Sequence, residues 1–410
     1  MNPVNATCAG CACLCDDIQV ELKNDQITKV ENACAKGNAL FRSCNNHSRR
    51  NNYLVGNKEV SLEQAVQEAS YLLQKAKNPI IFGADNSTLE TQALGIELGQ
   101  AIQAIIDDAS SFCQGSLIQG LFDGDIPSCG LADALTADLL IYWGSNPYHS
   151  HPRHLSKFSY YPRDDYKEVG ATPDVTLSCV EVRDTEVYQT SNPKFKIRPG
   201  GDKEFIQGIL TELGGETASE EARSFTQLMS KSRSCVIFAG LGLTYSLDGD
   251  FSLLEEMMTA FADQVQIRVI PMVGHFNMRG FNRSLYQLTG YVNKVKLINS
   301  PSHDQRLSFI EQVKKQTVDC ALIIGADPLS NLPWSVMKNL KDIPMICLDP
   351  FITATSTIAQ VVFGTAISGV EARGKAVRMD GEELNLLRVK QSEHATDEEI
   401  IGRLLSEVKR

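Results

Sequence analysis

The sequence has 410 residues, of which 43% are apolar, so the chain can bury a large core and we expect a globular protein of two or three lobes. Its formal net charge of −11 argues against a nucleic acid or an anionic membrane as a partner, because both would need a basic surface. No apolar stretch approaches the roughly 20 residues that span a bilayer, and the first residues lack the layout of a signal peptide. We therefore expect a cytoplasmic protein whose partners are small molecules or other protein subunits.

A cysteine-rich segment opens the chain. Cys8, Cys11 and Cys15 are spaced as C-x2-C-x3-C, and Cys34 follows in the motif CAKG. A cubane iron–sulfur cluster takes four thiolates, three of them usually from one tight loop and the fourth from farther along the chain. In a reducing cytoplasm clustered thiols favour metal ligation over disulfides, so this spacing predicts a 4Fe–4S cluster on these four cysteines. A structural zinc site and an accidental cluster are the alternatives.

Three other residues of this segment receive separate interpretations. Cys13 lies between predicted ligands and is expected to point away from them, and Cys44 has no suitable partner. Lys36, two residues after Cys34, is predicted to lie between the cluster and a pterin cofactor, where its charge would stand beside the electron path. The alternative for Lys36 is a solvated lysine.

Strand-length apolar runs then alternate with amphipathic helical stretches, which is typical of parallel βαβ construction. Three kinds of run recur in one order, each closed by Gly, Asn, Asp or Pro. The pairs are 78–88 with 234–244, 139–147 with 321–331, and 178–186 with 346–355. We therefore predict an α/β fold of two related, doubly wound parallel-sheet lobes, at 61–230 and 231–410, preceded by a small iron–sulfur subdomain at 1–60.

The turns after these strands are the predicted ligand-binding positions, because ligands of open α/β sheets lie at the carboxyl ends of strands where the strand order reverses. Two similar lobes would hold an extended ligand with two similar halves, and a bis(pterin guanine dinucleotide) has that shape. The predicted cofactor-binding residues in these turns are Gly144, Asn146, Arg183, Asp327 and Asp349. The alternative for any one turn is an ordinary βα connection.

The segment YHSHPRH holds His149, His151 and His154, which suggest metal ligands at first sight. Zinc hydrolases favour two histidines on one helix face, whereas Pro152 interrupts a helix here. We expect a loop that lines the pterin channel, with a subunit interface and a metal site as the alternatives.

Several segments together resemble the B subunit of formylmethanofuran dehydrogenase, a family of the molybdopterin oxidoreductase superfamily. They are CAGCACLCDDI with NACAKG, SFCQGS (111–116), DLLIYWGSNPYHSHPRHLSKF (138–158), IPMVGHFNMRGFN (270–282) and GVEARGKAVRMDG (369–381). The resemblance runs nearly from end to end.

The resemblance implies a catalytic subunit that interconverts CO2 and formate at tungsten or molybdenum held by two pterin dithiolenes, in a complex whose other subunits attach formate to methanofuran. It implies that Cys113 supplies the protein thiolate of that metal, besides the four cluster cysteines. Glu371 and Gly374 match an E-x-x-G stretch that contacts the pterin in the wider superfamily. A hairpin turn is the alternative for that stretch.

Two positions depart from the family pattern. We expect a histidine directly after the metal-binding cysteine and an arginine before the GH of GHFN, and this chain has Gln114 and Val273. Both changes remove groups suited to proton transfer and carboxylate binding, so His275 is predicted as a catalytic residue that partly substitutes, with Arg279 as the alternative substitute. The pattern resembles the corresponding subunit of the bacterial formyltransferase/hydrolase complex in tetrahydromethanopterin-linked formaldehyde oxidation. The alternative function is therefore a redox-inactive scaffold that has lost its metal–pterin.

Overall fold

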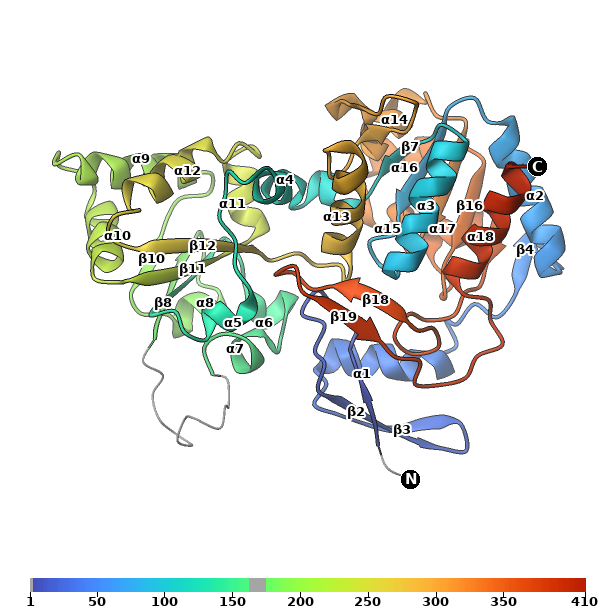
Figure 1. Cartoon of the computed structure of the whole chain (residues 1–410), viewed down its shortest axis with the longest axis horizontal. Helices are drawn as coiled ribbons and strands as arrows, with labels where there is room; N and C mark the ends of the chain where they lie inside the picture. The colour runs from blue at the N-terminus through green and yellow to red at the C-terminus, as the bar shows by residue number, and fades with distance from the viewer. Residues whose placement is uncertain (1–2, 162–174) are drawn as a thin grey trace. The chain divides into compact units, whose positions relative to one another are not determined.

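The computed structural model describes residues 3–161 and 175–410, which form two compact units (Figure 1). Unit 1 comprises the chain up to Phe112 together with His275–Arg378 and Glu383–Arg410. Unit 2 comprises Cys113–Gly274 and the short stretch Met379–Glu382. The chain therefore leaves unit 1 after its first quarter and returns to it at His275.

Unit 2 is built on five parallel strands in the order β10-β9-β8-β11-β12. They are β8 (Leu139–Trp143), β9 (Thr176–Glu181), β10 (Lys194–Lys196), β11 (Ser234–Ala239) and β12 (Gln266–Pro271). The central strands LLIYW and SCVIFA are almost wholly buried, as expected where helices cover both faces of a parallel sheet. The strand order reverses between β8 and β11, which is the topological switch point of a doubly wound sheet.

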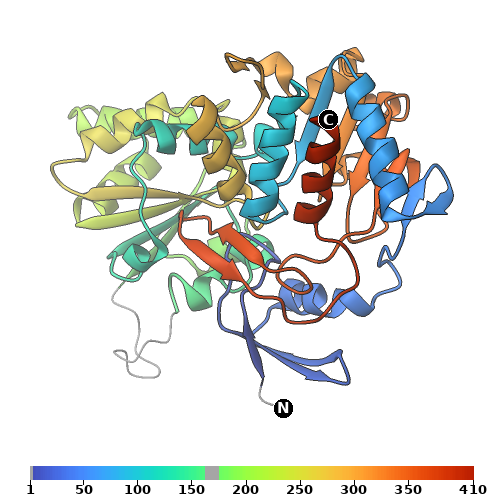
Figure 2. The same cartoon turned by 45° about the vertical axis from the view of Figure 1, so that its right-hand side comes forward.

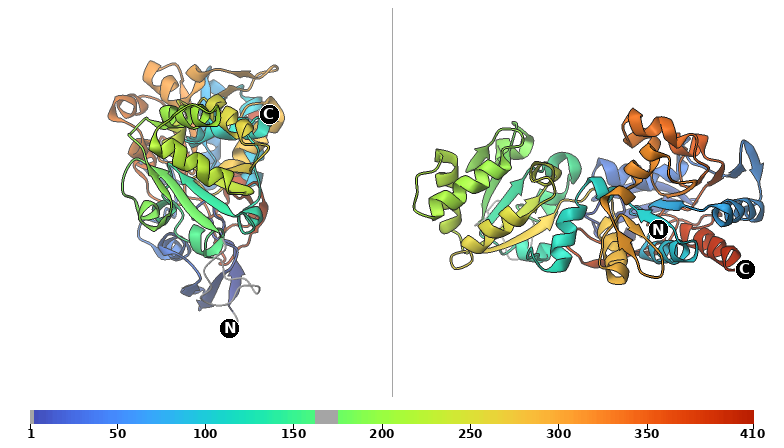
Figure 3. Two further views of the ribbon diagram at one scale, coloured as in Figure 1. Left: turned by 90° about the vertical axis from the view of Figure 1, so that its left-hand side faces the viewer. Right: turned by 90° about the horizontal axis from the view of Figure 1, so that it is seen from above.

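The helices of unit 2 flank this sheet (Figure 3). They are α4 (Gly115–Asp123), α5 (Leu131–Ala134), α6 (Pro147–Ser150), α7 (His154–Lys157), α8 (Glu186–Thr190), α9 (Asp202–Leu213), α10 (Glu220–Ser230), α11 (Leu241–Ser246) and α12 (Ser252–Ala260). Trp143 packs edge-on against Phe205 and Phe225, and its indole Nε1 donates to Asp202 Oδ1 at 2.7 Å. This bond joins the carboxyl end of β8 to the start of α9.

Unit 1 contains a nine-stranded sheet in the order β14-β13-β7-β6-β15-β16-β17-β4-β5. The central parallel strands are β7 (Ile105–Asp107), β6 (Pro79–Gly83), β15 (Cys320–Ile324), β16 (Met345–Leu348) and β17 (Val361–Phe363). Antiparallel strands extend both edges, namely β13 (Val295–Lys296), β14 (Ser302–His303), β4 (Tyr53–Val55) and β5 (Lys58–Val60). The order reverses between β6 and β15, so this sheet has a switch point of its own.

Helices and 3-10 turns cover both faces of this sheet. They are α2 (Leu62–Lys75), α3 (Leu89–Ala101), η2 (Ala109–Phe112), α13 (Met278–Thr289), η3 (Gln305–Leu307), α14 (Phe309–Lys315), α15 (Pro328–Asn331), α16 (Trp334–Leu340), α17 (Ala354–Ile358) and α18 (Asp397–Val408). Thr88 starts α3 by accepting a hydrogen bond from the backbone of Thr91 at 3.3 Å. None of the helices formed by the described residues is long and apolar enough to cross a membrane.

The N-terminal segment of unit 1 forms a three-stranded antiparallel sheet of β1 (Val4–Ala6), β2 (Ile18–Lys23) and β3 (Gln26–Glu31), followed by α1 (Ala35–Arg42) and η1 (Ser43–Asn45). A hairpin of β18 (Gly374–Val377) and β19 (Glu383–Leu386) lies beside it (Figure 2). Ala9 and Leu14 share a small apolar cluster with Phe276, Ala376 and Leu386. The cysteine loop is therefore packed into unit 1.

The unit boundaries differ from the expected division at residues 60 and 230. The three recurrent kinds of strand do lie side by side in one order in each sheet, as β6-β15-β16 in unit 1 and β11-β8-β9 in unit 2. Each sheet, however, combines strands from both halves of the chain, because β6 pairs with β15 in unit 1 and β8 pairs with β11 in unit 2. Residues 53–60, moreover, join the large sheet of unit 1. The expectation of two consecutive lobes is wrong because an apolar run indicates a buried strand without indicating its partner.

Candidate functional site

The cysteine loop of unit 1 connects β1 to β2. It closes on itself, because Cys8 N donates to Cys15 O at 2.8 Å and Leu14 N donates to Cys11 O at 3.1 Å. Burial raises the pKa of the Cys8 thiol to about 12, and the nearby thiols of Cys15, Cys11 and Cys34 add to that rise. The structure thus brings together the four cysteines that the spacing singles out.

Two glycines leave room beside the Cys8 sulfur. A Cβ on Gly10 would lie 3.2 Å from Cys8 Sγ, and a Cβ on Gly37 would lie 3.0 Å from it. Cys34 occupies the N-cap position of α1 without making a capping hydrogen bond through its side chain. These features fit a cluster held by the four thiolates. Within residues 3–161 and 175–410 no three His, Cys, Asp or Glu side chains are arranged to hold a single metal ion. A cubane does not require such an arrangement, because each of its thiolates binds a different iron.

Cys13 does not point away from the predicted ligands. It is fully buried, and its hydrogen bond to Cys11 is the main reason why the pKa of the Cys11 thiol is lowered to about 7. The expectation for Cys13 is wrong because the loop turns tightly, with Leu14 at a φ of 42°. Lys36 also lowers the pKa of Cys11, so its ammonium lies near the cysteine loop; its place between a cluster and a pterin stays a prediction.

A cavity of about 210 Å³ in unit 1 lies at the carboxyl ends of its central strands. Its lining includes Ala9 of the cysteine loop, Asn86 after β6, Gly325 after β15 and Asp349 after β16. Burial raises the pKa of Asp349 to about 7, so a neutral carboxyl group near neutrality can donate as well as accept a hydrogen bond. Asp327 instead accepts from the backbone and the hydroxyl of Thr355 at 2.9 and 2.6 Å, and it is not part of that lining.

Glu371 and Gly374 have structural roles within unit 1. Glu371 Oε2 accepts from Arg49 Nη2 at 2.6 Å and from the Ile367 backbone at 3.0 Å. A Cβ on Gly374 would lie 2.5 Å from Cγ2 of Thr88, so β18 packs directly on the start of α3. These contacts give Glu371 and Gly374 a role in packing unit 1. Contact of either residue with a pterin stays a prediction.

His275 lies where the chain re-enters unit 1. Its Nδ1 is 2.6 Å from Oδ2 of Asp85, and the imidazole is 39% exposed whereas the Asp85 carboxylate is fully buried. The Asp85 charge raises the pKa of His275 against the opposing effects of burial and of Lys36. Sequence reasoning did not find Asp85, although it follows a buried strand directly in the segment GADN.

Unit 2 has a cavity of about 460 Å³ at the switch point between β8 and β11. Gly144, Asn146 and Arg183 all line it, so the structure brings together the three predicted cofactor-binding residues of this unit, whereas Cys113 is not part of that lining. Gly144 has a φ of 60°, and a Cβ there would lie 2.5 Å from the backbone nitrogen of Leu243. The Oδ1 atom of Asn146 is buried without a partner, while its Nδ2 donates to Glu186 at 2.7 Å.

Cys113 is half-buried and lies two residues before the first residue of α4. Gln114 is fully buried, donates from Nε2 to Ala239 O at 3.1 Å and accepts from the Thr244 hydroxyl at 2.7 Å. Its amide thus joins α4 to the end of β11 and to α11. Val273 is also fully buried, so neither position presents an acid–base or anion-binding group.

The three histidines of 148–154 have separate partners. His149 pairs with Glu186 at 2.9 Å on the surface, and His151 Nε2 lies 2.8 Å from Val273 O. His154 is buried, with Nδ1 2.7 Å from the hydroxyl of Tyr142. A shared metal ion, the least favoured alternative from the sequence, has no support in these contacts.

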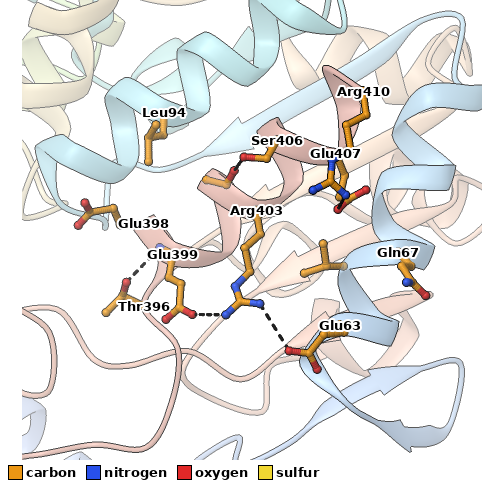
Figure 4. Close-up of a pocket in the computed structure, with 12 residues that line it drawn as sticks. Glu63, Gln67, Leu94, Thr396, Glu398, Glu399, Arg403, Ser406, Glu407 and Arg410 are labelled. Atoms are coloured by element: carbon orange, nitrogen blue, oxygen red, sulfur yellow. Dashed lines mark hydrogen bonds and ion pairs between the residues drawn. The ribbon is translucent and has the colours of Figure 1, made fainter.

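A larger cavity, of about 720 Å³, lies between α2 and α18 on unit 1 (Figure 4). Arg403 pairs there with Glu399 at 2.8 Å and with Glu63 at 3.5 Å. It contains none of the predicted site residues.

Comparison with known proteins gives two curated relatives of nearly the same extent. The chain is 28% identical over 431 residues to the B subunit of tungsten-containing formylmethanofuran dehydrogenase 2 of Methanocaldococcus jannaschii, in a match that covers 99% of this chain and 98% of that protein. The protein of the same name from Methanococcus maripaludis is also 28% identical, and the match covers 98% of each chain. No family model matches the chain.

Two solved structures share the fold. A chain of the formyltransferase/hydrolase complex of Methylorubrum extorquens, solved with methylofuran, matches with a TM-score of 0.70 at 16% identity, over 87% of this chain and 98% of that one. Acetylene hydratase of Pelobacter acetylenicus matches with a TM-score of 0.66 at 12% identity, over 100% of this chain and 69% of that one. The α/β units thus have the molybdopterin oxidoreductase type of fold. In sequence the chain is similar over nearly its whole length to the B subunits of tungsten-containing formylmethanofuran dehydrogenase.

Proposed function

We propose that the chain is the B subunit of a formylmethanofuran dehydrogenase-type complex and interconverts CO2 and formate in cytoplasmic one-carbon metabolism. Its partners would be the other subunits of that complex. The observation that carries the proposal is that Cys8, Cys11 and Cys15 of one buried loop lie near Cys34 at the start of α1, in a chain that is similar throughout to such B subunits. A scaffold with no electron transfer would have no use for that arrangement.

The four thiolates would hold a 4Fe–4S cluster, and Cys113 would bind tungsten or molybdenum carried by two pterin guanine dinucleotides. A soft thiolate suits such a metal, which when bound supplies the two-electron exchange with carbon. The cavity residues of each unit would bind one dinucleotide each. Asn146 offers a buried acceptor and Arg183 a cation in unit 2, and Asp349 offers a carboxyl group in unit 1.

The decisive experiment is elemental analysis of the complex purified without oxygen. We expect tungsten or molybdenum and about four iron atoms for this subunit. Cys113→Ala should remove the heavy metal and the formate-dependent activity while the iron of this subunit stays. Cys129→Ala is the matched control, because Cys129 is also half-buried in unit 2. A complex without either heavy metal would refute the proposal.

The buried amide of Gln114 and the buried side chain of Val273 favour a second candidate function. In that alternative the chain is a redox-inactive scaffold of a formyltransferase/hydrolase assembly that works with tetrahydromethanopterin. It predicts a complex free of tungsten and molybdenum in which Cys113→Ala leaves formate release unchanged.

A further inference from the structure

The pair of His275 and Asp85 is the partly exposed end of a buried polar group in unit 1. Asp85 stands in the turn after β6, and His275 precedes α13. Their 2.6 Å contact joins an imidazole that solvent can reach to a carboxylate that it cannot. Such a carboxylate fixes the ring orientation and holds the Nδ1 proton, which leaves Nε2 to exchange protons.

The backbone around this pair is held by several hydrogen bonds. Nε2 of Gln92 lies 2.9 Å from Ala84 O, 3.4 Å from Ser87 O and 3.0 Å from Asn277 O. Asn277 N donates to Asp85 O at 3.0 Å. The segments that carry Asp85 and His275 are therefore fixed to one another before any ligand binds.

A second buried carboxyl group, Asp108, lies behind Asp85. The hydroxyl oxygen of Ser110 accepts from Asn282 at 3.0 Å and from Asn293 at 2.8 Å, so its hydrogen is left to donate to Asp108 Oδ1 at 2.5 Å. The pKa of Asp108 is raised first by burial and next by the charge of Asp85. Oδ1 of Asp85 and Oδ2 of Asp108 are both buried without a partner, so two negative charges here would each lack a donor at one oxygen.

We propose that His275 is the acid–base residue of this subunit and that Asp85 is its positioning residue. Asp108 is protonated, so Asp85 carries the single negative charge beside the His275 imidazole. His275 Nε2 takes up or releases one proton at the exposed edge, while the Nδ1 proton stays on the hydrogen bond to Asp85. The assignment rests on the proposed function only for which substrate exchanges a proton with His275. The protonation of His275, Asp85 and Asp108 is a property of the chain itself. It places the acid–base group in unit 1. Gln114 and Val273, which belong to unit 2, then do not have to supply such a group.

Histidine NMR on the full chain tests the assignment without any metal. With 13C and 15N in its seven histidines, and with the His275 signal assigned from His275→Gln, wild-type His275 should titrate above the free value of about 6.5. Above that pKa its nitrogen shifts should report the Nδ1–H tautomer. An Nε2–H tautomer in the wild type would overturn the assignment even if no variant folds.

The variants separate the two aspartates. Asp85→Asn should lower the pKa of His275 below about 6.5, because burial and Lys36 then act unopposed. Asp108→Asn replaces one neutral group by another and should leave that pKa within a few tenths of the wild-type value. His303, stacked on Tyr291, is the internal control that neither variant should move. A His275 pKa that does not change in Asp85→Asn would refute the pairing.

In the assembled complex, Asp85→Asn should shift the pH profile of formate–CO2 exchange in the same direction as the NMR pKa. A loss of activity at all pH values without such a shift would indicate a structural role only. A complex without exchange activity would refute the proposed function, whereas the titration would still decide the assignment.

Discussion

Arg49 and Glu371 form an ion pair inside unit 1, with 2.6 Å between Nη2 and Oε2 and both side chains less than 5% exposed. Nη1 of Arg49 also donates to Pro350 O at 2.5 Å, so the pair anchors the turn that carries Asp349. Removal of one partner from a buried pair leaves an uncompensated charge and typically costs about 3–5 kcal/mol. Glu371→Leu should therefore lower the unfolding temperature of unit 1 by several degrees in calorimetry.

The double variant Arg49→Met with Glu371→Leu is the control for that prediction. It removes both charges, so it should regain much of the stability that Glu371→Leu loses. Asp184→Asn breaks an exposed pair with Lys196 and should leave the unfolding temperature unchanged. Equal losses in the single and double variants would show that the charge pair is not what holds this region together.

Gly37 offers a test of the cluster site that is separate from the cysteines. In most helices Gly→Ala is stabilising by up to about 1 kcal/mol, but a Cβ on Gly37 would press on Cys8 Sγ at 3.0 Å. We expect Gly37→Ala to fold and to lose iron and acid-labile sulfide. Gly402→Ala in α18 is the matched control, because its Cβ would meet only Leu94 Cδ1 at 3.9 Å. Full iron content in Gly37→Ala would remove the steric argument for the cluster.

The sequence predicted the kinds of strand but not how they assemble. The strands in the runs 78–88 and 234–244 are both buried, and each is followed by a residue that lines a cavity, Asn86 and Gly242. Nothing in either run shows that the first pairs with Cys320–Ile324 and the second with Leu139–Trp143, because continuous apolar strands have no side-chain alternation that would select a neighbour. Pairing across the halves of the chain depends on the whole fold.

The candidate site was predictable to a similar extent. Spacing selected the four cysteines that lie together, since short gaps hold Cys8, Cys11 and Cys15 in one loop and the fourth ligand of a cubane usually comes from farther along the chain. It could not find Asp108, because nothing in the sequence distinguishes this aspartate, fully buried beside Ser110, from one in a surface turn. It also did not foresee that Gln114 would form two buried hydrogen bonds within unit 2.

Asp349 should make the stability of unit 1 depend on pH. Burial raises its pKa to about 7 from an unfolded value of about 3.9, so the folded chain binds the proton more tightly. The resulting stabilisation is complete below about pH 4 and is lost as the pH rises towards 7. Asp349→Asn keeps an acceptor for the Phe351 backbone and cannot ionise. Its unfolding temperature should exceed that of the wild type by more at pH 8 than at pH 5, and exposed Asp342→Asn should show no such trend.

Gln114 should stabilise unit 2 through its amide. Gln114→Ala leaves the Thr244 hydroxyl and the Ala239 carbonyl without their side-chain partner in a buried place, at a typical cost of about 1–3 kcal/mol. We expect a lower unfolding temperature with the strands of unit 2 less protected in hydrogen exchange, while the strands of unit 1 keep their protection. Gln119→Ala, which removes exposed bonds to Asp123 within α4, is the control. If both variants behaved alike, the buried amide would have no structural role, and Gln114 would again be free to act in the chemistry next to Cys113.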